Sequence, residues 1–269
     1  MRAHADKTSA RPPAVAGLFY PDDPVELQDT VSSYLSHAPA VALPKEAAAF
    51  IVPHAGYIYS GSTAAVAYRA LANRKDVRRI VLIGPSHRVY LQGAAVPHAD
   101  VFLTPLGEVP IDPELKRAAR SVANVIESDA PHRDEHSLEV QLPFLQVVFG
   151  EFTLLPLVAG EASAAQVGAV LAALTEDDAT IVLASSDLSH YLSYAQAERV
   201  DAITSAAILR RDPTLTGNQA CGAVPINGLL HLARARGLAV KELARCNSGD
   251  TAGDRDRVVG YGTYALYAA

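Results

Sequence analysis

Three histidines in this sequence come shortly after the end of a short apolar run. They are His54, His87 and His190, and each run is rich in β-branched or other apolar residues. Ligands of open α/β sheets bind beyond the carboxyl ends of parallel strands, so we expect these side chains to lie near one another. Neutral imidazole is a common ligand of divalent transition metals. The sequence therefore predicts a mononuclear metal pocket with His54 and His87 as ligands.

The third ligand of such a site is harder to choose from the residues. Cys221 stands at the start of an expected helical run, where free backbone N–H groups favour a thiolate. A cysteine among apolar residues is, however, more often an inert core residue. Cys221 is a candidate third ligand on this basis, ahead of Cys246.

A second polar cluster contains His132, Asp134, Glu135, His136 and Glu139. His136 and Glu139 are three residues apart and would share one face of a helix. The simpler interpretation is a capped helix start, with the acidic residues near its positive end. The alternatives are direct ligation of a metal by these residues and a supporting role behind the ligands.

Apolar runs alternate with helical periods along the chain. The expected central strands are 47–52, 79–83, 153–158 and 180–184. An Asp23-Pro24 capping signal begins a first helix, and further helices are expected at 62–71, 113–122, 137–149, 164–174, 195–209 and 219–235. This alternation predicts an α/β fold with a central, largely parallel or mixed sheet flanked by helices on both faces.

The ends and connections complete this domain plan. Residues 1–10 are expected to form a flexible leader, and 11–269 a single domain. Short β segments are expected within 96–109, and a last strand within 257–267. The polar segment 247–251 is interpreted as an ordinary turn, with a position lining the pocket as the alternative.

Composition excludes several classes of protein. A net charge of -6 and a pI near 5.8 argue against a nucleic-acid partner. No apolar stretch is long enough for a membrane span or shaped like a signal peptide, so we expect a cytoplasmic protein with no membrane partner. The two cysteines do not suggest a disulfide framework. No dinucleotide, phosphate-loop or serine-hydrolase motif occurs.

Six short motifs occur in order between Arg11 and Tyr267. They are Val15-Ala16-Gly17-Leu18-Phe19-Tyr20-Pro21, Pro53-His54-Ala55-Gly56-Tyr57, Gly84-Pro85-Ser86-His87, Glu135-His136-Ser137-Leu138-Glu139-Val140-Gln141, Ser186-Asp187-Leu188-Ser189-His190 and Ser248-Gly249-Asp250. With this set the chain resembles the Memo family, whose bacterial and archaeal members are called AmmeMemoRadiSam system protein B.

The resemblance implies the fold of class III extradiol dioxygenases, in which two histidines and a glutamate hold Fe(II) and another histidine acts in acid–base chemistry. By position, His54 and His87 match the histidine ligands, and Cys221 matches the metal-binding cysteine of the family. Asp187 and His190 match the remaining catalytic pocket residues. A cysteine in place of the carboxylate departs from the dioxygenase pattern and puts ring cleavage in doubt.

Two functional hypotheses follow from these observations. The first is an oxidoreductase that uses one divalent metal, Fe(II) foremost and Cu or Zn otherwise, with His190 moving a proton and Asp187 orienting it. Four further residues are expected in the pocket or behind the ligands: Tyr57, Ser86, His136 and Glu139. The alternative is a binding, scaffold or metal-handling protein with a vestigial dioxygenase pocket. Expected partners are a small-molecule or peptide ligand and, by the resemblance, a radical SAM protein and an AMMECR-type protein.

Overall fold

Apolar runs form the parallel centre of a large sheet in the computed structural model, which describes residues 8–177 and 179–269. The central strands lie side by side in the order β2 (Ala47–Val52), β9 (Thr180–Ser185), β3 (Arg79–Pro85) and β8 (Thr153–Ala159). All three pairings between them are parallel. The four predicted central strands are therefore confirmed.

Strands of mixed direction extend this centre into a 9-stranded sheet. β12 (Val258–Ala268) lies antiparallel to β2, and both β10 (His190–Leu192) and β11 (Leu238–Asn247) pair with β12. On the other side, β4 (Ala94–Val96) lies antiparallel to β8, and β7 (Val125–Glu127) follows β4. The predicted last strand is confirmed.

A separate 3-stranded sheet contains the N-terminal segment. Its strands are β1 (Ala10–Arg11), β5 (Val101–Thr104) and β6 (Gly107–Pro110). Together with β4, the strands β5 and β6 are the short β segments expected near 96–109. Of the predicted leader, residues 1–7 lie outside the described part of the chain, and Ala10 pairs with Val101 of β5.

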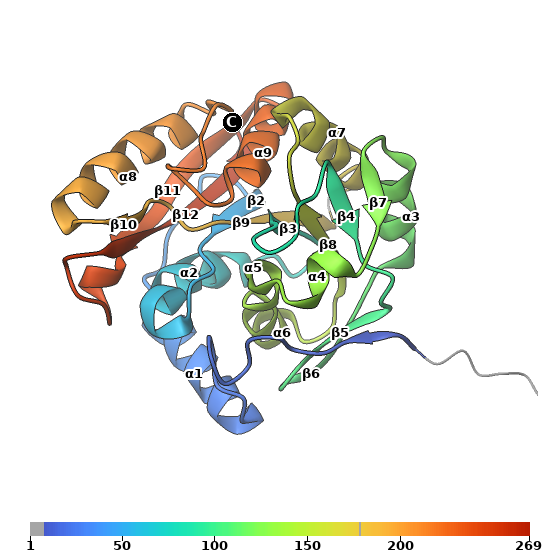
Figure 1. The fold of residues 1–269 in the computed structure, drawn as a ribbon, viewed down its shortest axis with the longest axis horizontal. Coiled ribbons are helices and arrows are strands. Elements are labelled where there is room, and N and C mark those ends of the chain that lie inside the picture. Colours follow the sequence, from blue (N-terminus) through green and yellow to red (C-terminus); the bar gives the residue numbers. More distant parts are fainter. Residues whose placement is uncertain (1–7, 178) are drawn as a thin grey trace, which may run out of the picture.

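Helices cover both faces of the large sheet, as predicted (Figure 1). One face carries α1 (Pro24–His37), α2 (Tyr57–Leu71) and α6 (Leu142–Phe149). The other carries α3 (Pro113–Ser121), α7 (Ala164–Leu174), α8 (Tyr194–Leu209) and α9 (Ala223–Ala235). The short elements are α4 (Ala130–Arg133), α5 (His136–Glu139) and η1 (Ser248–Asp250).

Alternate residues of one strand feed two separate cores, one on each face. In β2, Phe50 and Val52 pack in the core with α1, α2 and α6, whereas Ala49 and Ile51 pack in the core with α7 and α9. Because successive side chains of a strand point to opposite faces, a strand buried on both faces must be apolar throughout. This explains why the central strands could be predicted from continuous apolar runs in the sequence.

Some predicted boundaries were wrong for local reasons. The helix expected at 62–71 begins at Tyr57. Its first turn was missed because aromatic and β-branched residues have low helix propensity. The helix expected at 137–149 is divided into α5 and α6, with Pro143 at the start of α6. The helix expected from 219 begins at Ala223, because the loop before it brings Gly222 close to Ser186.

Strand β11 was not predicted. Its first and last residues are buried, but every residue between them is only half-buried. Charged side chains such as Lys241, Glu242 and Arg245 suit this partly exposed position, and they hide the strand pattern. In the described residues, no helix is long and apolar enough to cross a membrane.

Candidate metal centre

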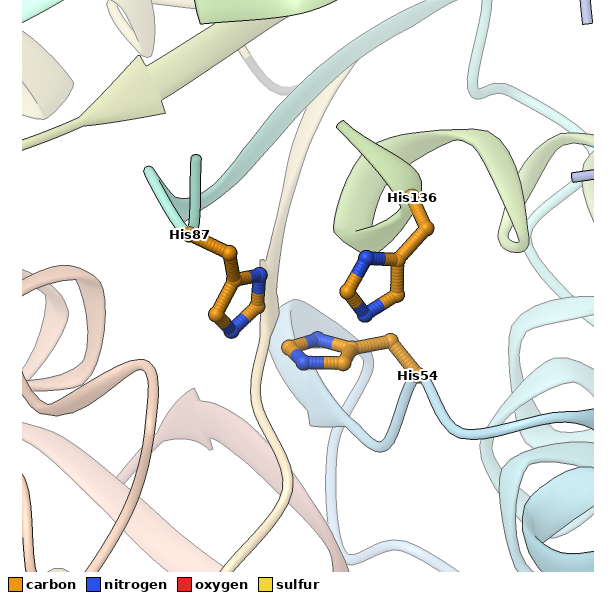
Figure 2. Close-up of side chains that lie close together, drawn as sticks. All are labelled: His54, His87 and His136. Carbon is orange, nitrogen blue, oxygen red and sulfur yellow. The ribbon is translucent and has the colours of Figure 1, made fainter. Parts of the chain in front are cut away.

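Three imidazoles converge at the carboxyl edge of the parallel strands (Figure 2). His54 follows β2, His87 follows β3, and His136 is the first residue of α5. One ring nitrogen from each residue lies within 4.8 Å of the others. The His87 and His136 rings stack with centroids 4.8 Å apart, and the His54 ring stands edge-on to both at 5.3 Å. Segments distant in sequence thus bring together a set of donors that could hold one metal ion.

The hydrogen bonds around Ser185 fix the tautomer of His54. Ser185 Oγ donates its only hydrogen to the carbonyl oxygen of Ser137 at 2.6 Å. It also accepts a hydrogen bond from Gln141 Nε2 at 2.9 Å. The contact between Ser185 Oγ and His54 Nδ1, at 3.0 Å, must therefore have the imidazole as donor. The free lone pair of His54 lies on Nε2, as a metal ligand requires.

Glu135 orients the second imidazole. Its carboxylate accepts the backbone N–H of His87 at 2.8 Å and the Nδ1–H of the same ring at 2.9 Å. It also accepts the Ser137 N–H at 2.9 Å, and His136 Nδ1 lies 3.5 Å from it. Burial alone would raise the pKa of Glu135. The hydrogen bonds from His87 and Ser137, with the charge interaction with His87, outweigh burial and lower this pKa to about 2. The carboxylate is thus an anion that directs His87 Nε2 away from itself.

The second polar cluster both caps a helix and contributes a histidine to the candidate metal site. Glu135 caps α5 by accepting the Ser137 N–H, as the preferred interpretation held. The same turn also brings His136 into the histidine cluster. Direct ligation was the less favoured interpretation, and His136 was predicted as a pocket or supporting residue. The structure places one of its ring nitrogens with those of His54 and His87.

Burial keeps two of the three imidazoles neutral. Burial, followed by the neighbouring imidazoles, lowers the pKa of His54 well below its usual value. Burial also lowers the pKa of His136 to about 4. Metal ligation needs unprotonated imidazole, so these residues fit a divalent metal near neutral pH.

Asp187 and Cys221 lie beside His54. The Asp187 Oδ1 atom accepts the His54 backbone N–H at 2.7 Å, and the Asp187 N–H donates to Cys221 Sγ at 3.3 Å. Cys221 Sγ lies 3.2 Å from His54 Nε2. Burial raises the pKa of Asp187 to about 7 and that of the Cys221 thiol to about 12. The predicted thiol therefore reaches the site, and its ligation stays a prediction.

His190 stands at the start of β10, apart from the three-histidine cluster. Its Nδ1 atom lies 2.9 Å from the Leu188 carbonyl oxygen, which can only accept, so the free lone pair is on Nε2. Burial lowers the pKa of this imidazole. The loop before it is held by Asp201, which accepts the Ser189 N–H at 3.0 Å. A neutral, oriented imidazole of this kind could accept a proton.

A cavity of about 1140 Å³ opens over these groups. Its lining contains His54, His87, His136, Asp187, His190 and Cys221, together with Phe19, Tyr59, Arg88, Tyr191, Asn218, Gln219, Ser248, Asp254, Arg257 and Tyr261. Ser248 belongs to the polar segment predicted as an ordinary turn, so the alternative for that segment was the better one. This volume is large enough for a small organic molecule beside a metal ion.

Some predicted site residues lie elsewhere. Tyr57 is buried and donates through its hydroxyl to the Val140 carbonyl oxygen, and Tyr59 lines the cavity in its place. Ser86 donates to the Val89 carbonyl oxygen and lines a separate small cavity that also reaches Cys221.

Glu139 anchors the N-terminal segment instead of facing the cavity. Its fully buried carboxylate pairs with Arg11 and accepts the N–H groups of Ala14 and Val15 and the hydroxyl of Tyr20. Within that segment, the Phe19 ring lies 4.8 Å from the His136 ring. Glu139 and its partners therefore hold α5, and with it His136, in place. The sequence pattern does not reveal these long-range contacts.

The family model described as Memo-like protein matches residues 11–265. The chain belongs to the Memo family. A MEMO1 family protein from Archaeoglobus fulgidus is 38% identical over 93% of this chain and 97% of its own length. A MEMO1 family protein from Aeropyrum pernix is 36% identical, with the same shares covered. The predicted family is therefore confirmed.

A solved structure is similar to this Memo-family chain in fold alone. The crystal structure of an uncharacterized protein from Escherichia coli K12 superposes with a TM-score of 0.55 at 13% identity. The match covers 81% of this chain and 98% of the other.

Proposed function

We propose that this Memo-family protein binds one divalent metal ion through His54, His87 and His136 and uses it in an oxidoreductase reaction. The observation that carries the proposal is the convergence of three ring nitrogens at the floor of a cavity of about 1140 Å³. The Nδ1 atoms of His54 and His87 are occupied by Ser185 and Glu135, which leaves Nε2 available in both rings.

Iron is the metal we propose, on the strength of the resemblance to class III extradiol dioxygenases. Imidazole donors suit Fe, Cu and Zn, and copper or zinc are the competing ions. Bound Fe(II) would supply open coordination positions and one-electron redox chemistry next to the cavity.

His190 is proposed to hold and move the proton of the reaction at its Nε2 atom. Its Nδ1 atom is committed to Leu188, and its lowered pKa leaves the ring neutral near pH 7. Asp187 is proposed to orient His54 by accepting its backbone N–H. Cys221, next to His54 Nε2, is a further soft donor for a thiophilic ion.

Oxygen consumption tests the proposed activity. Protein loaded anaerobically with Fe(II) and then exposed to air should consume O2 faster than a matched His190→Ala variant. The exposed His98 lies outside the cavity, so His98→Ala serves as the control and should behave as wild type. Equal traces for wild type and His190→Ala would contradict the role of His190. Tight iron binding without turnover would assign the protein to metal handling.

Elemental analysis of two variants tests the third ligand. We expect His136→Ala to lose most of its iron and Cys221→Ala to retain it. The reverse result would replace His136 with Cys221 in the ligand set. Association with a radical SAM protein and an AMMECR-type protein stays a prediction.

A further inference from the structure

Two arginines line the cavity, although the whole chain carries a net charge of -6. Arg88, next to His87, and Arg257, at the start of the last strand, both line it. In the described part of the chain, neither guanidinium forms an ion pair with a carboxylate. Arginines in protein cavities usually pair with anions, so these two groups are available to a ligand.

The geometry of Arg257 suits recognition of an anion. Its guanidinium carbon lies 5.1 Å from the centre of the Tyr191 ring. A guanidinium that stacks on a ring keeps the N–H groups at its edge free, and those groups match the two oxygens of a carboxylate or phosphate. Tyr191 itself is held with φ at 59°, and its exposed side chain contributes to the cavity wall.

The acidic residues of the lining do not neutralise these arginines. Asp254 Oδ1 accepts the backbone N–H groups of Asp256 at 2.9 Å and Arg257 at 3.2 Å. Asp187 is buried and uses its Oδ1 atom on the His54 N–H. Both carboxylates therefore serve the surrounding backbone.

The candidate metal ligands add no negative charge either. Imidazole binds a metal without contributing negative charge, so a divalent ion held by His54, His87 and His136 would keep its full charge toward the cavity. This step rests on the proposed function. Apolar and aromatic surface completes the lining, with Phe19, Tyr59, Tyr191 and Tyr261.

We propose that the cavity binds a small organic anion, whose carboxylate or phosphate group is held by Arg257 and Arg88 and whose body lies against the aromatic side chains. The charge of the ligand then determines its affinity, and a neutral molecule of the same shape binds poorly.

Calorimetric titration of the full chain with benzoate and with benzamide tests this proposal, because the two molecules have nearly the same shape and differ in charge. We expect benzoate to bind roughly tenfold or more tightly than benzamide, in line with charge-assisted hydrogen bonds. Phenylphosphonate in a third titration identifies the anionic group, since a preference for either anion over benzamide supports the proposal.

Arg257→Gln should reduce the preference for benzoate roughly tenfold. Arg255→Gln is the matched control, because Arg255 lies two residues away on the same exposed turn, stacks on Tyr194 and does not line the cavity. Failure of both benzoate and phenylphosphonate to bind more tightly than benzamide to wild type, or an unchanged preference in Arg257→Gln, would overturn the proposal.

The titrations are repeated with metal-free and with zinc-loaded protein, because zinc adds charge without redox chemistry. A preference for benzoate in both forms, larger with zinc, is the expected result. Failure to bind zinc with a preserved benzoate preference would refute the metal site and leave the anion site standing. Zinc binding without a preference for either anion over benzamide would refute the anion site alone.

Discussion

The two sides of the histidine cluster are built in different ways. His54 is only 2% exposed, follows a central strand directly and is fixed by neutral groups, chiefly Ser185. The His87 side chain is 28% exposed, and its orientation depends on the anionic Glu135, which also lies beside His136. The inner side is thus positioned by the sheet, and the outer side by buried charge on α5. We expect the outer side to be the more sensitive to loss of charge.

Removal of the Glu139 carboxylate should give the largest effect on stability. Glu139→Ala would leave the buried Arg11 without its partner and release the N-terminal segment from α5. Breaking a buried ion pair on one side costs about 3–5 kcal/mol, so we expect a decrease of that size in the free energy of unfolding. Chemical denaturation measures it. The exposed Glu151→Ala serves as control, and similar midpoints for the two variants would contradict the role assigned to Glu139.

Acid should weaken the outer side through His132, a buried residue of α4, the short helix before α5. Burial lowers the pKa of His132 to about 4, from an ordinary 6.5. The unfolded chain therefore binds this proton first as the pH falls, and the stabilisation present above pH 6.5 is lost as the pH approaches 4.

The loss attributable to His132 amounts to about 3 kcal/mol at most. His132→Gln does not titrate and can still donate to the Ala95 carbonyl oxygen, which His132 Nε2 contacts at 3.0 Å. Denaturation at pH 7 and pH 4 should show a smaller decrease for this variant than for wild type. Identical decreases in the two proteins would show that protonation of His132 does not cause the loss of stability in acid.

Neutralising Glu135 tests the outer side directly. Glu135→Gln keeps the size of the side chain but removes the anion that accepts two hydrogen bonds from His87. Loss of a group that orients a metal ligand in this way lowers metal affinity about 10–100-fold. Competition with a metal chelator measures the change, and a loss of less than about twofold would show that charge does not hold this side.

Removal of the Ser185 hydroxyl tests the inner side, where we expect the smallest effect. Ser185→Ala removes the acceptor for His54 Nδ1–H, but β9 and β2 still hold the surrounding backbone. We expect about a tenfold loss of metal affinity. A loss greater than that of Glu135→Gln would reverse the comparison between the two sides.

The sequence predicted the positions of His54 and His87 better than that of His136. The runs at β2, β3 and β9 are apolar because both faces of those strands are buried, and His54 and His87 follow such strands directly. Because residues beyond the carboxyl ends of parallel strands lie close together, their positions were sufficient to predict a shared site for these two residues. The likeness to the Memo family strengthened the choice of Cys221, whose sulfur does lie next to His54.

The position of His136 could not be predicted in the same way. It depends on a short helix whose place is set by contacts between Glu139 and residues more than a hundred positions away. The hydrogen bonds of Ser185 with Ser137 and Gln141 are likewise long-range, and no local pattern encodes them. The spacing of His136 and Glu139 raised a role at a metal but did not place His136 beside His54 and His87.

Metal stoichiometry under anaerobic conditions tests the central claim most directly. Wild-type protein, equilibrated with Fe(II) and freed of excess ion, should retain about one iron per chain, as expected for a single site with three protein ligands. His54→Ala should retain almost none while its circular dichroism spectrum stays that of wild type. Wild type without bound metal, or a folded His54→Ala variant that retains the full complement, would contradict the proposal that these imidazoles hold one ion.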